Sequence, residues 1–134
     1  MKLFIFLLLF SNAAFSAPKE APKPEMSDAL KEATANLALS GGAADAKYNL
    51  ALVLAKEAKW KEASLFFKQA SDSLSGTKKA KALYNLAYTQ IMQGDYEKAK
   101  DNLRSALSYD LDNKAIKENL AWLEKQEPPI FSGD

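Results

Sequence analysis

The chain has 134 residues, enough for one domain, and its 18 basic and 17 acidic side chains leave it almost neutral. A chain without a basic surplus has no electrostatic footprint for nucleic acid or an anionic membrane, so we expect neither as a partner. It contains no His and no Cys, which removes the commonest general base, metal ligand and strong nucleophile. We therefore expect no enzymatic activity, no cofactor and no bound metal.

The first 16 residues have the three-part pattern of a secretory signal peptide. Lys2 supplies the positive start, residues 3–10 are an unbroken apolar run, and residues 14–16 place small side chains where signal peptidase reads them. We expect cleavage after Ser16, because Pro18 hinders a cut one bond later. The alternative is an uncleaved membrane anchor, but the apolar run is short for a bilayer and no stable span is expected.

A cleaved signal predicts a periplasmic or secreted protein of bacterial type. No cysteine follows the apolar run, so a lipoprotein anchor is excluded. Residues 17–26 carry three prolines among alternating charges, which predicts an extended, solvated linker.

The first predicted helix begins at Ser27, a suitable N-cap, and runs through Leu39 to the Gly41-Gly42 break. It is either a cap over the array or a degenerate half-repeat. A helical hairpin follows over residues 44–58 and 60–74, with a break at residues 75–77.

A second hairpin is predicted over residues 78–93 and 95–108. Gly94 is suited to a left-handed helix end, and Asp95 to capping the next helix. A last helix starts at Asp112 or Asn113 and ends before Pro128, and residues 127–134 are expected to be a flexible tail. Charged residues on the last helix predict a solvated outer face, typical of a capping helix: Lys114, Lys117, Glu118, Glu124 and Lys125.

The two hairpins repeat each other in sequence. Tyr48-Asn49-Leu50-Ala51 recurs 36 residues later as Tyr84-Asn85-Leu86-Ala87. The Asn-Leu-Ala part occurs a third time as Asn119-Leu120-Ala121, 34 residues after Asn85. In the second helices, Ala63, Phe67 and Ala70 correspond to Ala99, Leu103 and Ala106. A period near 34 indicates a helical solenoid, in which each hairpin buries its apolar face against its neighbours.

Over residues 44–126 the chain resembles the tetratricopeptide repeat family. The resemblance rests on Leu83, Leu86 and Ala87, on residues 94–99, and on their counterparts in the first hairpin. Departures from the family pattern are Ala51 and Ala87 for Gly, Gln90 for Tyr, and the missing Pro at Ser75 and Leu111.

The resemblance implies an all-α, short right-handed solenoid of about six helices. The expected domain covers residues 27–126, with repeats at 44–77 and 80–113 and a capping helix at 114–126. It also implies a concave peptide groove lined by the first helix of each hairpin. The expected lining is Tyr48, Asn49, Leu52, Lys56, Lys81, Tyr84, Asn85, Tyr88, Met92, Asn119 and Trp122.

Asparagine suits such a groove because its amide can donate to and accept from a peptide backbone, while Tyr and Trp offer large apolar area. The alternative is structural: the asparagine is usual in the family, and Tyr48 and Tyr84 pack against neighbouring helices. Some family members clamp a C-terminal carboxylate. At the matching positions Tyr48, Leu52, Asn85, Ala115 and Asn119, only Asn85 fits, so this mode is not expected.

These features predict a non-catalytic adaptor or scaffold of the bacterial envelope that binds a peptide or protein segment in the groove. One alternative is a structural subunit that forms homo-oligomers by stacking through the solenoid ends. Another is a small-molecule or glycan binder, which would use the aromatic surface of Tyr84, Tyr88 and Trp122.

Overall fold

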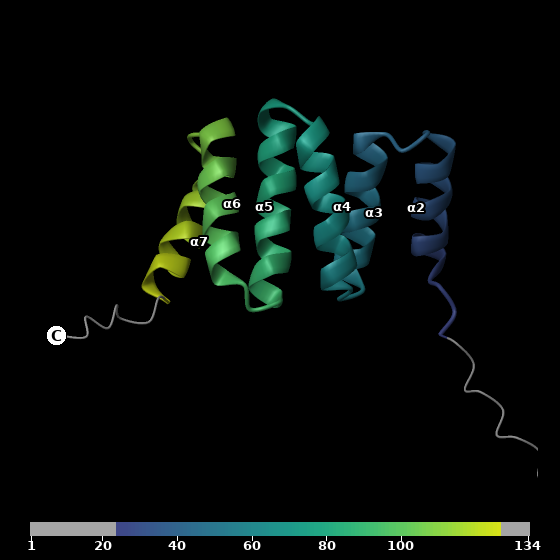
Figure 1. The fold of residues 1–134 in the computed structure, drawn as a ribbon, viewed down its shortest axis with the longest axis horizontal. Coiled ribbons are helices and arrows are strands. Elements are labelled where there is room, and N and C mark those ends of the chain that lie inside the picture. The colour runs from purple at the N-terminus through teal and green to yellow at the C-terminus, as the bar shows by residue number, and fades with distance from the viewer. Residues whose placement is uncertain (1–23, 127–134) are drawn as a thin grey trace, which may run out of the picture.

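A computed structural model describes residues 24–126, which form six α-helices and no strand. The helices lie side by side in a row, from α2 at one end to α7 at the other (Figure 1). The expected all-α, tetratricopeptide-like helical solenoid is thus confirmed. The predicted signal peptide, most of the predicted linker and the predicted tail lie outside the described residues.

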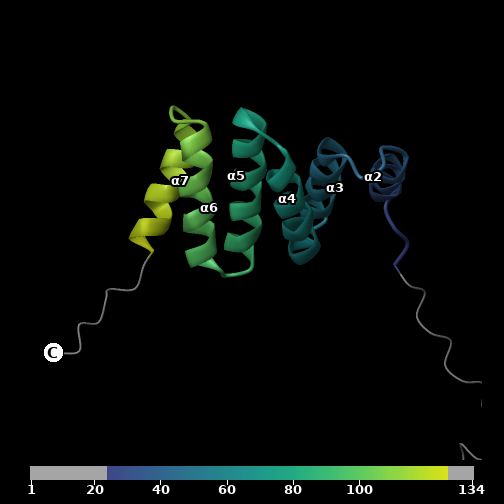
Figure 2. The ribbon, with the colours of Figure 1, turned by 45° about the horizontal axis from the view of Figure 1, so that its top comes forward.

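The row begins with α2 (Asp28–Leu39), whose start is fixed by Ser27 as predicted. The Ser27 hydroxyl accepts a hydrogen bond from the Leu30 amide at 3.1 Å and donates one to Glu57 at 2.9 Å. The same side chain therefore caps α2 and links it to the end of the next helix. Figure 2 shows α2 turned away from the direction of the other helices.

Two hairpins follow, and a single helix closes the row. The first hairpin pairs α3 (Ala44–Lys56) with α4 (Trp60–Ser73), and the second pairs α5 (Gly76–Met92) with α6 (Tyr96–Tyr109). The last helix is α7 (Lys114–Lys125), capped by the Asn113 side chain, which accepts from the Ile116 amide at 3.1 Å. We call α3, α5 and α7 the first helices and α2, α4 and α6 the second helices.

The boundary between the hairpins differs from the prediction. Only Leu74 and Ser75 separate α4 from α5, because α5 begins at Gly76 and not at Lys78. With 17 residues, α5 is four longer than α3, whereas α4 and α6 have 14 each. The spacing of 36 between the hairpins therefore comes from an additional turn of helix and not from a longer loop.

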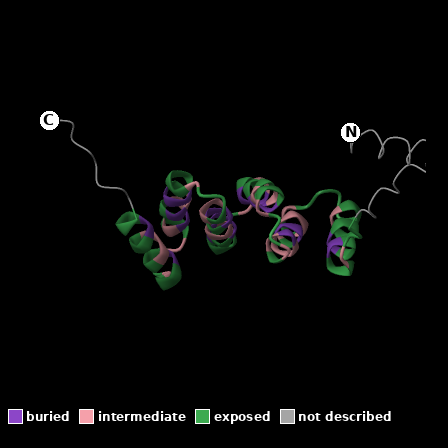
Figure 3. Ribbon diagram, turned by 90° about the horizontal axis from the view of Figure 1, so that it is seen from below, coloured by how far each residue is buried: buried purple, intermediate pink, exposed green. Residues whose placement is uncertain are grey.

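The core runs along the row between the helices, with alanine alternating with larger side chains. Ala51, Ala63, Ala87 and Ala99 are completely buried, which lets neighbouring helix backbones approach closely. Figure 3, seen from below, shows the helices staggered in a zigzag, with buried residues facing neighbouring helices. The gaps are filled by Leu50, Leu54, Phe67, Leu86, Leu103, Ile116 and Leu123.

Candidate functional site

The three first helices are joined by a repeated hydrogen bond between tyrosine and asparagine. Asn85 Nδ2 donates to Tyr48 Oη at 2.9 Å, which ties α5 to α3. Asn119 Nδ2 donates to Tyr84 Oη at 3.1 Å, which ties α7 to α5, and also to the Ala115 carbonyl at 2.8 Å. These bonds define one continuous surface of α3, α5 and α7, which we call the first-helix face.

Tyr48 is held on both sides. Its ring meets Phe67 edge-on with centroids 5.6 Å apart, and burial raises the pKa of its phenol while the bond from Asn85 partly opposes that rise. Because Asn85 and Asn119 already donate to tyrosine oxygens, the Tyr–Asn contacts first hold the helices together. This is the structural role that the sequence left open beside the ligand-binding one.

The accessible members of the predicted lining lie beside these cross-links. Tyr88, Met92 and Trp122 are large apolar side chains that are 46, 47 and 45% exposed. Tyr88 is one turn beyond Tyr84 on α5, and Trp122 lies three residues beyond Asn119 on α7. The Tyr84–Asn119 bond therefore brings the aromatic side chains of two helices to one part of the face. Asn49, Lys56 and Lys81 are exposed as well, whereas Leu52 is half-buried.

Two hollows lie between the first helices. One, of about 290 Å³, lies between α3 and α5 and includes Tyr48, Asn49 and Lys81. The other, of about 170 Å³, lies between α5 and α7 and includes Lys81, Tyr84 and Asn85. Lys81 borders both hollows, so it is the predicted cation best placed to meet a carboxylate on this face.

The neighbouring lysines of α5 already have partners, and Lys78 lines the α3–α5 hollow together with its partner Asp45. Lys78 lies 3.5 Å from Asp45 of α3, and the Lys79 ammonium sits 5.3 Å from the centre of the Tyr109 ring. These contacts to other helices offset the unfavourable position of cations at a helix start.

The turn aromatics behave differently in the two hairpins. Trp60 meets Tyr88 edge-on, with ring centroids 5.7 Å apart. Tyr96, its counterpart 36 residues later at the start of α6, is 45% exposed.

Sequence reasoning missed a groove on the opposite side of the row. This second-helix groove, of about 760 Å³, lies between α4 and α6 with Leu86 and Gln90 of α5 among its lining residues. Leu65 on its rim is 55% exposed. Leu65, an apolar residue on the polar face of the amphipathic helix α4, was the sequence feature that could have indicated this groove.

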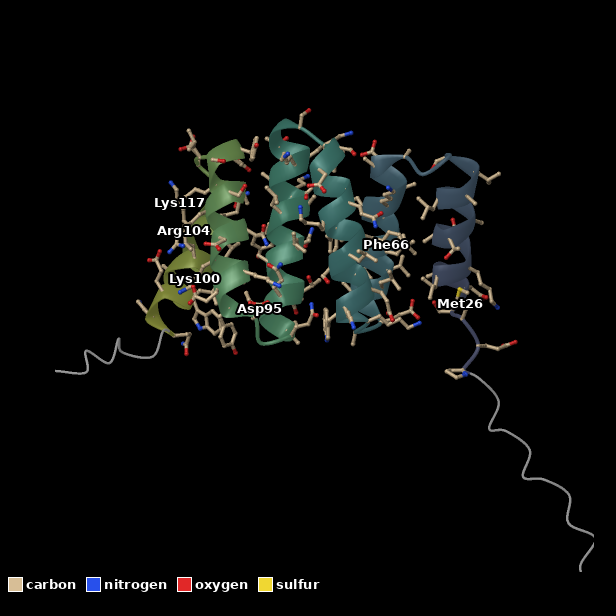
Figure 4. The ribbon with its side chains drawn as sticks, in the orientation of Figure 1. Met26, Phe66, Asp95, Lys100, Arg104 and Lys117 are labelled. Carbon is tan, nitrogen blue, oxygen red and sulfur yellow. The ribbon has the colours of Figure 1, made fainter. Side chains whose placement is uncertain are left out.

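A buried lysine was missed too. Lys100 on α6 is only 1% exposed and forms an ion pair with Glu97 at 2.9 Å. Figure 4 shows Lys100 near the α6–α7 junction, with Arg104 above it on the same helix. Arg104 lies 3.9 Å from Glu124 of α7. Arg104 thus reaches from α6 to α7, and nothing in the repeat pattern distinguished Lys100 from a surface lysine.

The described part of the chain holds no group of three or more His, Cys, Asp or Glu placed to bind a metal ion. Over residues 24–126, no helix combines the length and apolarity needed to cross a membrane.

Residues 80–113, which cover α5 from Ala80 onward and all of α6, match the family model of the tetratricopeptide repeat. No curated protein matches the chain. Tetratricopeptide repeats generally mediate protein–protein interactions, and the proteins that carry them are typically non-catalytic adaptors.

Proposed function

We propose that the protein is an exported, non-catalytic adaptor of the bacterial envelope that binds a peptide or protein segment on its first-helix face. The observation that carries the proposal is the exposure of Tyr88, Met92 and Trp122 together beside the Tyr84–Asn119 bond. Large apolar side chains on a surface are costly to leave in water, and such residues are the usual anchors of binding sites.

The polar surroundings favour a peptide over an apolar small molecule. Asn49, Lys56 and Lys81 are exposed on the same face, and the two hollows beside Lys81 can receive side chains or a carboxylate. Because the helices are already fixed by Tyr–Asn bonds, the face is preorganised and loses little entropy on binding. The predicted signal peptide supports placement of this adaptor outside the cytoplasm.

The test is capture of envelope proteins by the tagged wild-type chain and by a Tyr88→Ala/Trp122→Ala variant. Both side chains are half-exposed and neither makes an interhelical hydrogen bond, although Tyr88 also meets the Trp60 ring. Circular dichroism of the variant should therefore show the wild-type helix content, and it is measured before the capture is compared. We expect the double variant to lose at least about tenfold of the captured partner, since aromatic anchors are each worth about 1 kcal/mol or more.

Leu65→Ala is the matched control, because Leu65 is equally exposed but lies on the second-helix groove. It should retain the partner. Loss of the partner with Leu65→Ala and retention with the double variant would contradict the proposal and place binding on the opposite side. Replacement of Tyr84 or Asn85 is a poorer test, because it breaks the bonds between the first helices.

A further inference from the structure

Each end of the row lacks one helix of a hairpin. In α2, Leu30 and Ala33 are buried in the positions that Phe67 and Ala70 occupy in α4, 37 residues later. Helix α2 is therefore the second helix of a hairpin, and no first helix precedes it within residues 24–126. At the other end, α7 is a first helix that no second helix follows in that range. Figure 1 shows α2 and α7 at opposite ends of the row.

The α2 end carries a groove where the missing helix would lie. This N-terminal groove, of about 560 Å³, lies between α2 and α3 and is lined by Ala29, Ala33, Ala46, Asn49 and Val53 among others. Small apolar side chains form the floor of this groove. At other junctions of the row, such side chains lie where two helices approach closely.

Comparison of α3 with α5 shows what the groove lacks. In α5, Ala82 and Thr89 are completely buried, but their counterparts in α3, Ala46 and Val53, are only half-buried. Asn49 is the counterpart of Asn85, which bonds to a tyrosine of the preceding first helix. Within the described residues, the Asn49 amide has no hydrogen-bond partner.

One side of α7 likewise lacks the neighbouring helix that covers the same side of α5. Leu83 and Ala87 of α5 are buried, but Lys117 and Ala121, 34 residues later in α7, are exposed. Lys117 lies at the α7 end of the row (Figure 4). Glu118 stands in the register position of Tyr84, whose oxygen accepts from an asparagine.

We propose that the N-terminal groove binds α7 of a second copy of this chain, so that α7 of one copy and α2 of the next complete a hairpin across the junction. The repeat register then places Glu118 of one copy where its carboxylate accepts a hydrogen bond from Asn49 of the other. Trp122, 45% exposed, would lie one turn further along the same junction.

The repeat register, rather than net charge, specifies this occupant. The groove lining includes Glu32 and Asp45 and no Lys or Arg, although Asp45 also lies 3.5 Å from Lys78.

The exposed side of α7 carries both signs: Lys117 is exposed, Lys114 lies 3.6 Å from Glu118, and Glu124 lies 3.9 Å from Arg104. Lys117 forms no ion pair within the described residues, so this α7 cation can meet the acidic groove.

The size of the junction sets the strength of association. With 12 residues, α7 is about 18 Å long and about 10 Å wide, so its footprint is below the roughly 800 Å² per partner of a standard interface. We therefore expect weak, concentration-dependent association. Because the two surfaces differ, the contact does not close on itself, and the mass should keep increasing with concentration.

The test uses the full chain, expressed with its own N-terminus and purified as the cell processes it. Its mass is measured by light scattering from about 10 μM to about 1 mM, the range of a weak complex. We expect the wild-type mass to rise well above that of one chain.

By the register in which Asn102 donates to Gln90, Ala29 faces Glu124 of the other copy, so Ala29→Glu brings two carboxylates together at the junction. Ala121→Glu puts a bulky charged side chain at the position where Ala87 of α5 is completely buried. Each variant should therefore stay at the mass of one chain throughout.

An equimolar mixture of the two variants gives the decisive result. Each retains one intact end, so the mixture should form a complex of two chains that does not grow further. Ala35→Glu is the matched control, because Ala35 is exposed on α2 but does not line the groove, and its mass should rise as in the wild type.

A wild-type mass equal to one chain at every concentration would overturn the proposal and leave the groove to a partner helix or to residues 1–23. It is equally overturned if the mixture stays monomeric or if Ala29→Glu still associates. Trp122 belongs to both proposed surfaces, so Tyr88→Ala alone separates the two proposals. Tyr88 lies on α5, outside the junction, and this variant should lose the captured partner but associate as the wild type does.

Discussion

Tyr48 and Tyr84 occupy the same position in successive first helices, and each phenolic oxygen accepts a hydrogen bond from the asparagine of the next first helix. A second polar contact joins helices within the second hairpin, where Asn102 Nδ2 donates to Gln90 Oε1 at 2.8 Å. Their counterparts 36 residues earlier are the apolar Phe66 and Leu54. At the scale of residues, the repeat thus keeps the tyrosine–asparagine bond between first helices but not the polar pair within the hairpin.

Removing one phenolic oxygen should weaken the fold. In Tyr48→Phe the Asn85 amide is left partly buried without its acceptor, so we expect the free energy of unfolding to fall by about 1 kcal/mol. Urea unfolding followed by circular dichroism measures it. The control is Tyr88→Phe, whose exposed oxygen should matter by less than about 0.5 kcal/mol. Equal losses in the two variants would mean that the Tyr–Asn bond does not stabilise the row.

The sequence predicted which tyrosines and asparagines face one side but not that they bond to each other. Tyr48 and Asn85 are 37 residues apart, and Tyr84 and Asn119 are 35 apart. The pairing depends on how closely consecutive first helices pack, which periodicity alone does not give. For the same reason, the burial of Lys100 under α7 could not be read from its charge.

Three helices of this chain end in the same way. At the ends of α2, α3 and α5 a left-handed residue follows the cap, and the next amide donates to the carbonyl five residues earlier. The left-handed residues are Gly41, Ala58 and Gly94, with φ of 68°, 58° and 80°. Ala58 is the exception, because its Cβ makes this conformation unfavourable.

Ala58 and Gly94 therefore offer a matched pair of opposite substitutions. Ala58→Gly removes the strain of about 1–2 kcal/mol but increases the entropy of the unfolded chain by about 0.4–1 kcal/mol, so the expected net gain is about 0.5–1 kcal/mol. Gly94→Ala should lose a similar amount, and no atom lies within 4 Å of the added methyl to complicate the comparison. Midpoints of thermal unfolding that shift in the same direction for both variants would contradict this account.

The helices themselves were predictable, because Ser27, Asp95 and Asn113 cap them as their residue types suggest. The start of α5 was not. Ser75 to Thr77 read as a break, and Lys78 with Lys79 oppose the helix dipole. Contacts with Asp45 and Tyr109, which are distant in sequence, offset that cost and allow one more turn.

At the scale of the whole molecule, the described chain is a half-hairpin, two hairpins and a half-hairpin. The sequence left open whether the N-terminal helix is a cap or a half-repeat, because α2 has lost the repeat's characteristic residues. Its burial pattern, with Leu30 and Ala33 inward and Ala29 exposed, identifies it as a second helix. The solenoid was predictable from the period, but its two open ends and the second-helix groove required the helices to be placed in space.

The account's central claim is that a partner binds the first-helix face, and site-specific photo-crosslinking in cells tests it most directly. A photoreactive phenylalanine analogue is placed at Tyr88 on that face and, in a separate variant, at Leu65 on the second-helix groove. Both side chains are about half-exposed, so both probes can reach a bound protein. The account predicts a discrete adduct from position 88 and none from position 65. An adduct from position 65 with none from position 88 would contradict it.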